Sequence, residues 1–78
     1  MNKQIKELAE QAGSVYQKNL DVYLLRHDEL EKFAELVVQE CMRMCDVAAV
    51  GYETHGHTKE ANGCYSAKEY IEEHFGVE

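Results

Sequence analysis

An apolar stripe with heptad spacing runs through the middle of the chain and constrains the fold more than any other feature. Its members lie alternately four and three positions apart: Leu30, Ala34, Val37, Cys41, Met44 and Ala48. This spacing predicts an α-helix with one apolar face, and the chain holds no proline to break it. Asp28 and Glu31 have the spacing of a capping box. We therefore expect the helix to begin at Asp28 and to run from about residue 29 to 50.

The stripe is wide enough to face two neighbours. Further apolar residues broaden it: Phe33, Leu36, Val38, Met42 and Val47. A helix from residue 29 to 50 would be about 33 Å long, more than short flanking helices can cover. One neighbour would be those flanking helices. The other would be a second copy, so we expect the six heptad residues to form the seam of a homo-oligomer. The alternative is a wide helix buried inside a monomeric bundle.

The N-terminal segment predicts a short amphipathic helix. Asn2 is placed to cap it, and Gly13 supplies the positive φ that ends it. Residues 14–27, "SVYQKNLDVYLLRH", are ambiguous, because short apolar runs fit a helix or an extended connection. Between the two we expect a helix.

The C-terminal segment predicts the last helix. Ser66 and Glu69 have capping-box spacing, and Gly76 lies where a terminating residue belongs. We expect its apolar face to point to the core; that face comprises Ala67, Tyr70, Ile71 and Phe75. The predicted fold is all-α: a single domain over residues 1–78, built as a small bundle of three or four helices around one long central helix.

Size and charge narrow the functional classes. A chain of 78 residues buries a thin core. Residues 28–78 carry four basic and twelve acidic side chains, which argues against non-specific nucleic-acid binding. No apolar run is long enough to span a membrane, and no signal-peptide region opens the chain. We expect a cytoplasmic protein without a cofactor, whose three cysteines remain reduced.

The stretch "GYETHGHTKEANGC", residues 51–64, predicts a connection between the long helix and the last one. It contributes His55, His57 and Cys64, to which Cys41 and Cys45 could be added as zinc ligands. The spacing is not that of a zinc finger or knuckle. Both helical cysteines also lie on or near the apolar stripe, where free cysteine behaves as a small core residue. A structural zinc site is therefore the alternative, and burial of both thiols is the expectation.

Nothing in the same stretch completes a catalytic set, since no nucleophile elbow, phosphate loop or zinc-protease pattern is present. We expect no enzymatic activity. Tyrosines near connections, with nearby basic side chains, could instead bind a partner protein or a nucleotide. These candidates are Tyr16, Tyr23, Arg26, Arg43, Tyr52, His55 and His57.

Three blocks of the sequence occur in a familiar order: "IKELAEQAG" at 5–13, "KFAELVVQECM" at 32–42 and "IEEHFGVE" at 71–78. Together they cover about a third of the chain, and they resemble a group of short, mostly uncharacterised accessory proteins of tailed bacteriophages. The resemblance implies a phage accessory protein in the bacterial cytoplasm. Together with the apolar stripe, the acidic surface and the absent catalytic motif, it leads us to expect a non-enzymatic protein that binds a host protein in a host-takeover or counter-defence role. The alternative it leaves open is an oligomeric sponge that sequesters a nucleotide immune signal.

Overall fold

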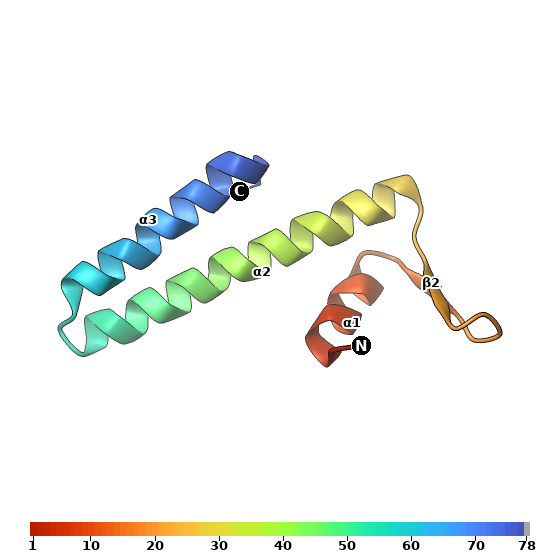
Figure 1. The fold of residues 1–78 in the computed structure, drawn as a ribbon, viewed down its shortest axis with the longest axis horizontal. Coiled ribbons are helices and arrows are strands. Elements are labelled where there is room, and N and C mark those ends of the chain that lie inside the picture. The colour runs from red at the N-terminus through yellow and green to blue at the C-terminus, as the bar shows by residue number, and fades with distance from the viewer. Residues whose placement is uncertain (78) are drawn as a thin grey trace. The chain divides into compact units, whose positions relative to one another are not determined.

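The computed structural model describes residues 1–77, which form three helices and one β-hairpin (Figure 1). In chain order the elements are α1 (Lys3–Gln11), β1 (Val15–Gln17), β2 (Val22–Leu24), α2 (His27–Thr54) and α3 (Thr58–Phe75). The chain divides within α2 into two compact units, residues 1–37 and the residues from 38 onward. The prediction of a mostly helical chain with one long helix is confirmed, but the hairpin shows that the fold is not all-α as expected. A single domain stays a prediction.

Helix α1 begins and ends where the sequence indicates. The side chain of Asn2 accepts a hydrogen bond from the backbone N–H of Gln4 at 2.8 Å, which caps the first turn. Gly13 takes a φ of 98° and ends the helix. Its N–H donates to the carbonyl of Glu10, and that of Ser14 donates to the carbonyl of Ala9, the two bonds of a Schellman motif. Both predicted boundaries are confirmed.

Residues 15–24 form an antiparallel hairpin, so the expected helix over residues 14–27 is wrong. Tyr16 pairs with Tyr23, flanked by Val15 opposite Leu24 and by Gln17 opposite Val22. Valine and tyrosine favour a pleated backbone. The turn over residues 18–21 places Asp21 at a φ of 51°, a conformation that aspartate tolerates better than most residues. Cross-strand pairing and this turn therefore override the helical alternative.

Helix α2 begins at His27, two residues earlier than the predicted start at residue 29. The carbonyl of Arg26 accepts from the N–H of Leu30, which makes Arg26 the cap residue in place of Asp28. The Glu29 carboxylate accepts from the N–H of Arg26 at 2.8 Å, the reciprocal half of a capping box. The hairpin fixes where the chain enters the helix. It therefore decides which of Asp28, Glu29 and Glu31 accepts a hydrogen bond from the cap residue.

The predicted connection over residues 51–64 is mostly helical. Helix α2 continues to Thr54, and α3 starts at Thr58, so only residues 55–57 connect them. Gly56 has a φ of 77°, and the N–H groups of Gly56 and His57 donate to the carbonyls of Glu53 and Tyr52. This second Schellman motif closes the turn. The expected capping box at Ser66 and Glu69 is wrong, because both residues lie inside α3.

In the second unit, α3 runs back alongside the C-terminal half of α2 (Figure 1). Ala49 and Ala61 are fully buried and Met42 nearly so, which places small side chains where the two helices approach each other. Lys68 reaches across to Asp46 with an N–O distance of 2.8 Å. The Tyr65 hydroxyl bonds the Glu53 carboxylate, and this bond raises the pKa of Tyr65. The contact therefore combines a narrow alanine core with polar links.

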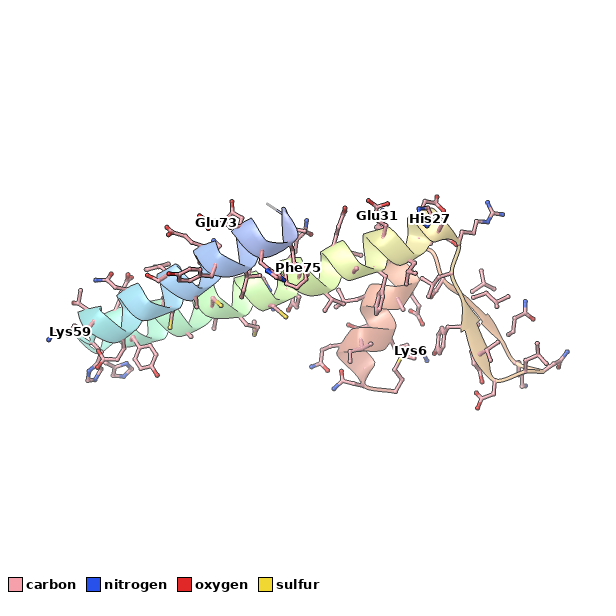
Figure 2. The ribbon with its side chains drawn as sticks, turned by 45° about the horizontal axis from the view of Figure 1, so that its top comes forward. Lys6, His27, Glu31, Lys59, Glu73 and Phe75 are labelled. Carbon is pink, nitrogen blue, oxygen red and sulfur yellow. The ribbon has the colours of Figure 1, made fainter. Side chains whose placement is uncertain are left out.

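The expected core-facing stripe of α3 is largely at the surface. Tyr70 is 74% exposed and Phe75 is 59% exposed, while Ile71 is half-buried and Ala67 exposed. Figure 2 shows α3 from Lys59 near its start to Phe75 at its end, with Glu73 pointing away from α2. The helix ends at Gly76, with a φ of 65°, as predicted.

Within residues 1–77, no helix is long and apolar enough to cross a membrane.

Candidate functional site

The turn between α2 and α3 brings together three of the predicted binding residues. The Tyr52 ring meets the His57 ring edge-on, with centroids 6.3 Å apart and planes at 88°. The Nδ1 atom of His55 lies 2.9 Å from the carbonyl oxygen of Gly51. Because a carbonyl only accepts, this nitrogen carries the proton and leaves Nε2 exposed as the free ring atom. Both histidines are thus anchored by the turn that holds them.

These side chains line an open hollow of about 510 Å³. Its other lining residues are Ala48 and Gly51. The Tyr52 ring can stack on a planar group, His57 can donate a hydrogen bond to an anion, and the free Nε2 of His55 can accept one.

A second, more apolar groove lies between α2 and α3 and has a volume of about 530 Å³. Its lining residues come from both helices: Met44, Cys45, Ala48, Tyr52, Glu60, Gly63, Cys64 and Ala67. Most of the α2 members belong to or adjoin the predicted seam. Of the α3 members, Glu60, Gly63 and Cys64 were not predicted as interface residues, because residues 51–64 were expected to form a connection. Ala67 was assigned to the core face of the last helix.

The five candidate zinc ligands are not gathered into one site. Cys45 and Cys64 line the apolar groove and are half-buried, while Cys41 is exposed. His55 and His57 lie at the turn instead. Among residues 1–77 no three His, Cys, Asp or Glu side chains are close enough to hold a metal ion. The expected burial of both helical thiols is wrong for Cys41 in a single copy of the chain.

The hairpin of the first unit holds the other tyrosine pair. The rings of Tyr16 and Tyr23 lie across the two strands with centroids 5.0 Å apart. The Tyr16 hydroxyl donates to the carboxylate of Asp21, which raises the pKa of Tyr16. Leu20 at the turn is 71% exposed. The hairpin therefore exposes aromatic and aliphatic side chains on two short paired strands.

The two predicted arginines have other contacts than the tyrosine and histidine candidates. Arg43 is paired with Glu40 one turn earlier on α2, and this bond raises the pKa of Arg43 and lowers that of Glu40. Arg26 caps α2 through its backbone. Of the seven candidates, the structure thus assembles Tyr16 with Tyr23, and Tyr52 with His55 and His57.

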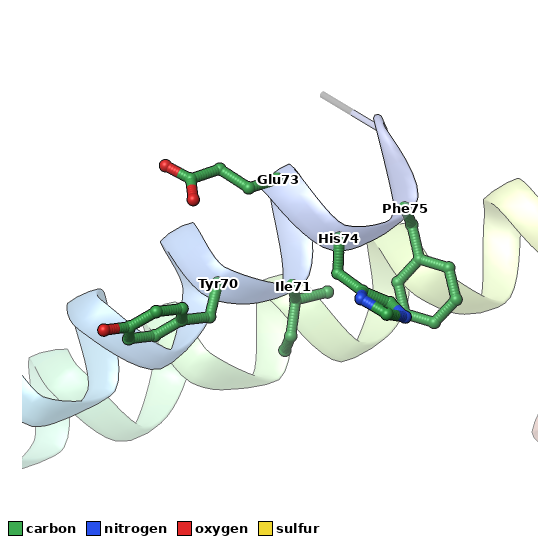
Figure 3. Close-up of a pocket in the computed structure, with 5 residues that line it drawn as sticks. All are labelled: Tyr70, Ile71, Glu73, His74 and Phe75. Atoms are coloured by element: carbon green, nitrogen blue, oxygen red, sulfur yellow. The ribbon is translucent and has the colours of Figure 1, made fainter.

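An aromatic surface at the C-terminal end of α3 escaped the sequence analysis. His74 and Phe75 meet edge-on with ring centroids 4.8 Å apart (Figure 3). They line an open hollow of about 510 Å³ together with Tyr70, Ile71 and Glu73. The aromatic residues could be read from the sequence, but their spacing was assigned to a core face.

Comparisons with known proteins add no family to this picture. No protein-family model matches the chain, and neither a curated protein nor a solved structure is significantly similar to it. The resemblance of the three sequence blocks to phage accessory proteins therefore stays a prediction.

Proposed function

We propose that this chain is a non-enzymatic binding protein of a bacteriophage, which engages a host protein and so counters a host defence. One observation carries the binding part of this proposal. Among the described residues, the buried apolar set consists of four alanines and one methionine, whereas most large apolar side chains lie at least partly exposed. Such surface is costly to leave in water and typically marks an interaction site.

The β-hairpin is the surface we assign to the host protein. Val15, Val22 and Leu24 are exposed on one face of the two strands, and Tyr16 and Tyr23 lie on the other. The sheet has only these two strands, so its outer edges offer backbone groups to an added strand. Tyrosine is enriched at interface hot spots.

The host-binding proposal is tested by comparing capture from host lysate by three forms of the chain. We expect the unmodified chain and a Tyr70→Ser control to retain the same host protein, and the double variant Tyr16→Ser/Tyr23→Ser to lose it. Tyr70 is the matched control because it is the most exposed of these tyrosines and lies in the other unit. Equal capture by all three forms would contradict the assignment.

The counter-defence role is tested in infected cells. Expression of the chain in a host strain that restricts a phage should restore plaque formation, and the hairpin double variant should not. If the chain leaves plating unchanged across strains with different defences, the counter-defence part of the proposal is wrong, whatever the capture experiment shows.

We also propose that the protein is a homo-oligomer, with the exposed seam of α2 at its interface. Leu30 is 54% exposed and Met44 is 44% exposed, and Ala34, Cys41 and Ala48 are exposed as well. Val37 is the half-buried exception. Light scattering should give at least twice the chain mass of 9.0 kDa. A mass of one chain at all concentrations would refute it.

A nucleotide sponge is the second candidate, and the hollow at the turn is the observation that favours it. Tyr52 can stack on a base, His57 can donate to a phosphate, and the free Nε2 of His55 can accept from an amino group of the base. A nucleotide at a hundred times its dissociation constant should stabilise the fold by about 2.7 kcal/mol. Thermal-shift measurements with cyclic and linear nucleotides test this. Melting temperatures that do not move with any nucleotide would remove the candidate.

A further inference from the structure

The groove between α2 and α3 is built from small side chains flanked by larger ones. Ala48, Gly63 and Ala67 line it with small side chains, while Met44 and Tyr52 line it from α2 as larger, partly exposed ones. Only one of its lining residues, Glu60, carries a charge. Depletion of charge at the centre of a surface is typical of the core of a protein interface.

The pair of helices that forms this groove has little core of its own. Among residues 38–77, only Met42, Ala49 and Ala61 are buried, and all of them belong to the contact between α2 and α3. Domains of about 40 residues usually need disulfides, metals or association to be stable. Apolar residues that remain outside this contact are therefore available for association.

We infer that a second copy of this chain covers the groove by laying its own α2–α3 pair against it, which gives a four-helix bundle. This inference rests on the proposed homo-oligomer and specifies its surface. Each copy offers both large exposed side chains, Met44 and Tyr52, and a recess lined by the small residues Ala48, Gly63 and Ala67. A surface with both features can be complementary to itself, as a twofold interface requires.

The size and spacing of the surface also fit a second copy. Cys41, Met44 and Ala48 continue the heptad spacing, whose natural partner is a helix with the same period. Two helices about 25 Å long and about 9 Å apart present a face of roughly 500 Å² on each copy. The total of roughly 1,000 Å² reaches the size at which specific interfaces begin.

The first test changes the recess and leaves the opposite side of α2 as control. Ala48→Arg or Ala67→Arg would place an unpaired charge in the covered groove. We expect either change to raise the dissociation constant of the dimer at least about a hundredfold by light scattering. Val50→Arg is the matched control, because Val50 is exposed on α2 and does not line the groove. Circular dichroism checks that every variant keeps its helices.

The outcomes separate this inference from the proposed oligomer. If the unmodified chain is a monomer, both are overturned. If it is an oligomer that neither groove variant weakens, the oligomer stands and the groove assignment is overturned. The host-binding proposal is unaffected by either result, since it rests on the hairpin.

The second test needs no substitution and decides the matter if a groove variant fails to fold. Cys45 and Cys64 line the groove, whereas Cys41 does not. At high protein concentration we expect a bulky maleimide to label Cys45 and Cys64 at least about tenfold more slowly than after dilution below the dissociation constant. Mass spectrometry of the labelled peptides assigns each thiol. Labelling rates of Cys45 and Cys64 that do not change with concentration would overturn the inference.

Discussion

Gly13 and Glu29 show how single residues join neighbouring elements in the first unit. The glycine ends α1 with a φ of 98°, and a Cβ atom at this position would lie 2.7 Å from Oε2 of Glu29. The other carboxylate oxygen of Glu29 accepts from the backbone of Arg26 and caps α2. A side chain at position 13 would therefore disturb both the end of α1 and the cap of α2.

Gly13→Ala should destabilise the protein by about 1–2 kcal/mol, because alanine is strained at positive φ and its methyl group displaces the capping carboxylate. Gly51→Ala is the control: Gly51 lies within α2, and its Cβ position is open. That change should stabilise the helix by about 0.5–1 kcal/mol. Urea unfolding measures both. Equal effects of the two substitutions would refute the argument.

The Tyr16 hydroxyl gives the hairpin a pH dependence at high pH. Its bond to Asp21 holds the folded-state pKa of Tyr16 above the value of about 10 of the unfolded chain. This contribution to stability is complete below pH 10, and it is lost as the pH rises through the folded pKa. Asp21→Asn should lower the pKa of Tyr16 and keep the turn, since asparagine also tolerates positive φ.

Difference absorbance at 295 nm between the unmodified chain and Tyr16→Phe isolates the titration of Tyr16. We expect the isolated transition to move to lower pH in the Asp21→Asn background. A transition that stays in place would show that the carboxylate does not control the hydroxyl.

At the scale of elements, alanines set how closely α2 and α3 approach. Ala49 and Ala61 are fully buried, so neither site has room for a larger side chain. Ala61→Leu should lower the free energy of unfolding by about 1–3 kcal/mol through overpacking. Asn62→Leu is the control, because its neighbouring position on α3 is exposed. Chemical denaturation of both variants checks the prediction, and an unchanged stability of Ala61→Leu would contradict it.

At the scale of the whole molecule, the two units should differ in protection from solvent exchange. The first contains strands of three residues each and buries only Ala9 and Ala12. Two-stranded hairpins are marginally stable in water. In hydrogen-exchange mass spectrometry we expect residues 15–24 to exchange first and the amides of α3 last. Protection of the hairpin equal to that of α3 would contradict this order.

The sequence by itself determined the features that depend on local chemistry. Asn2, Gly13 and Gly76 mark helix ends because a cap or a positive φ acts within one turn, and the heptad spacing marked the long helix. The tyrosine and histidine candidates were also identifiable, since their chemistry is independent of position. The sequence did not show which of these side chains lie together in the fold.

Tertiary structure decided the competition between equally plausible local signals. Three acidic residues in the first turn, Asp28, Glu29 and Glu31, could cap α2, and the hairpin register selected Glu29 to support Arg26. The Ser66 box was passed over because an earlier start of α3 buries Ala61 against α2. That burial and the turn at Gly56 outweigh the helix penalty of about 1 kcal/mol at Gly63. Side-chain contacts between distant segments supply energies that no local pattern contains, and here they set the element boundaries and assembled the groove.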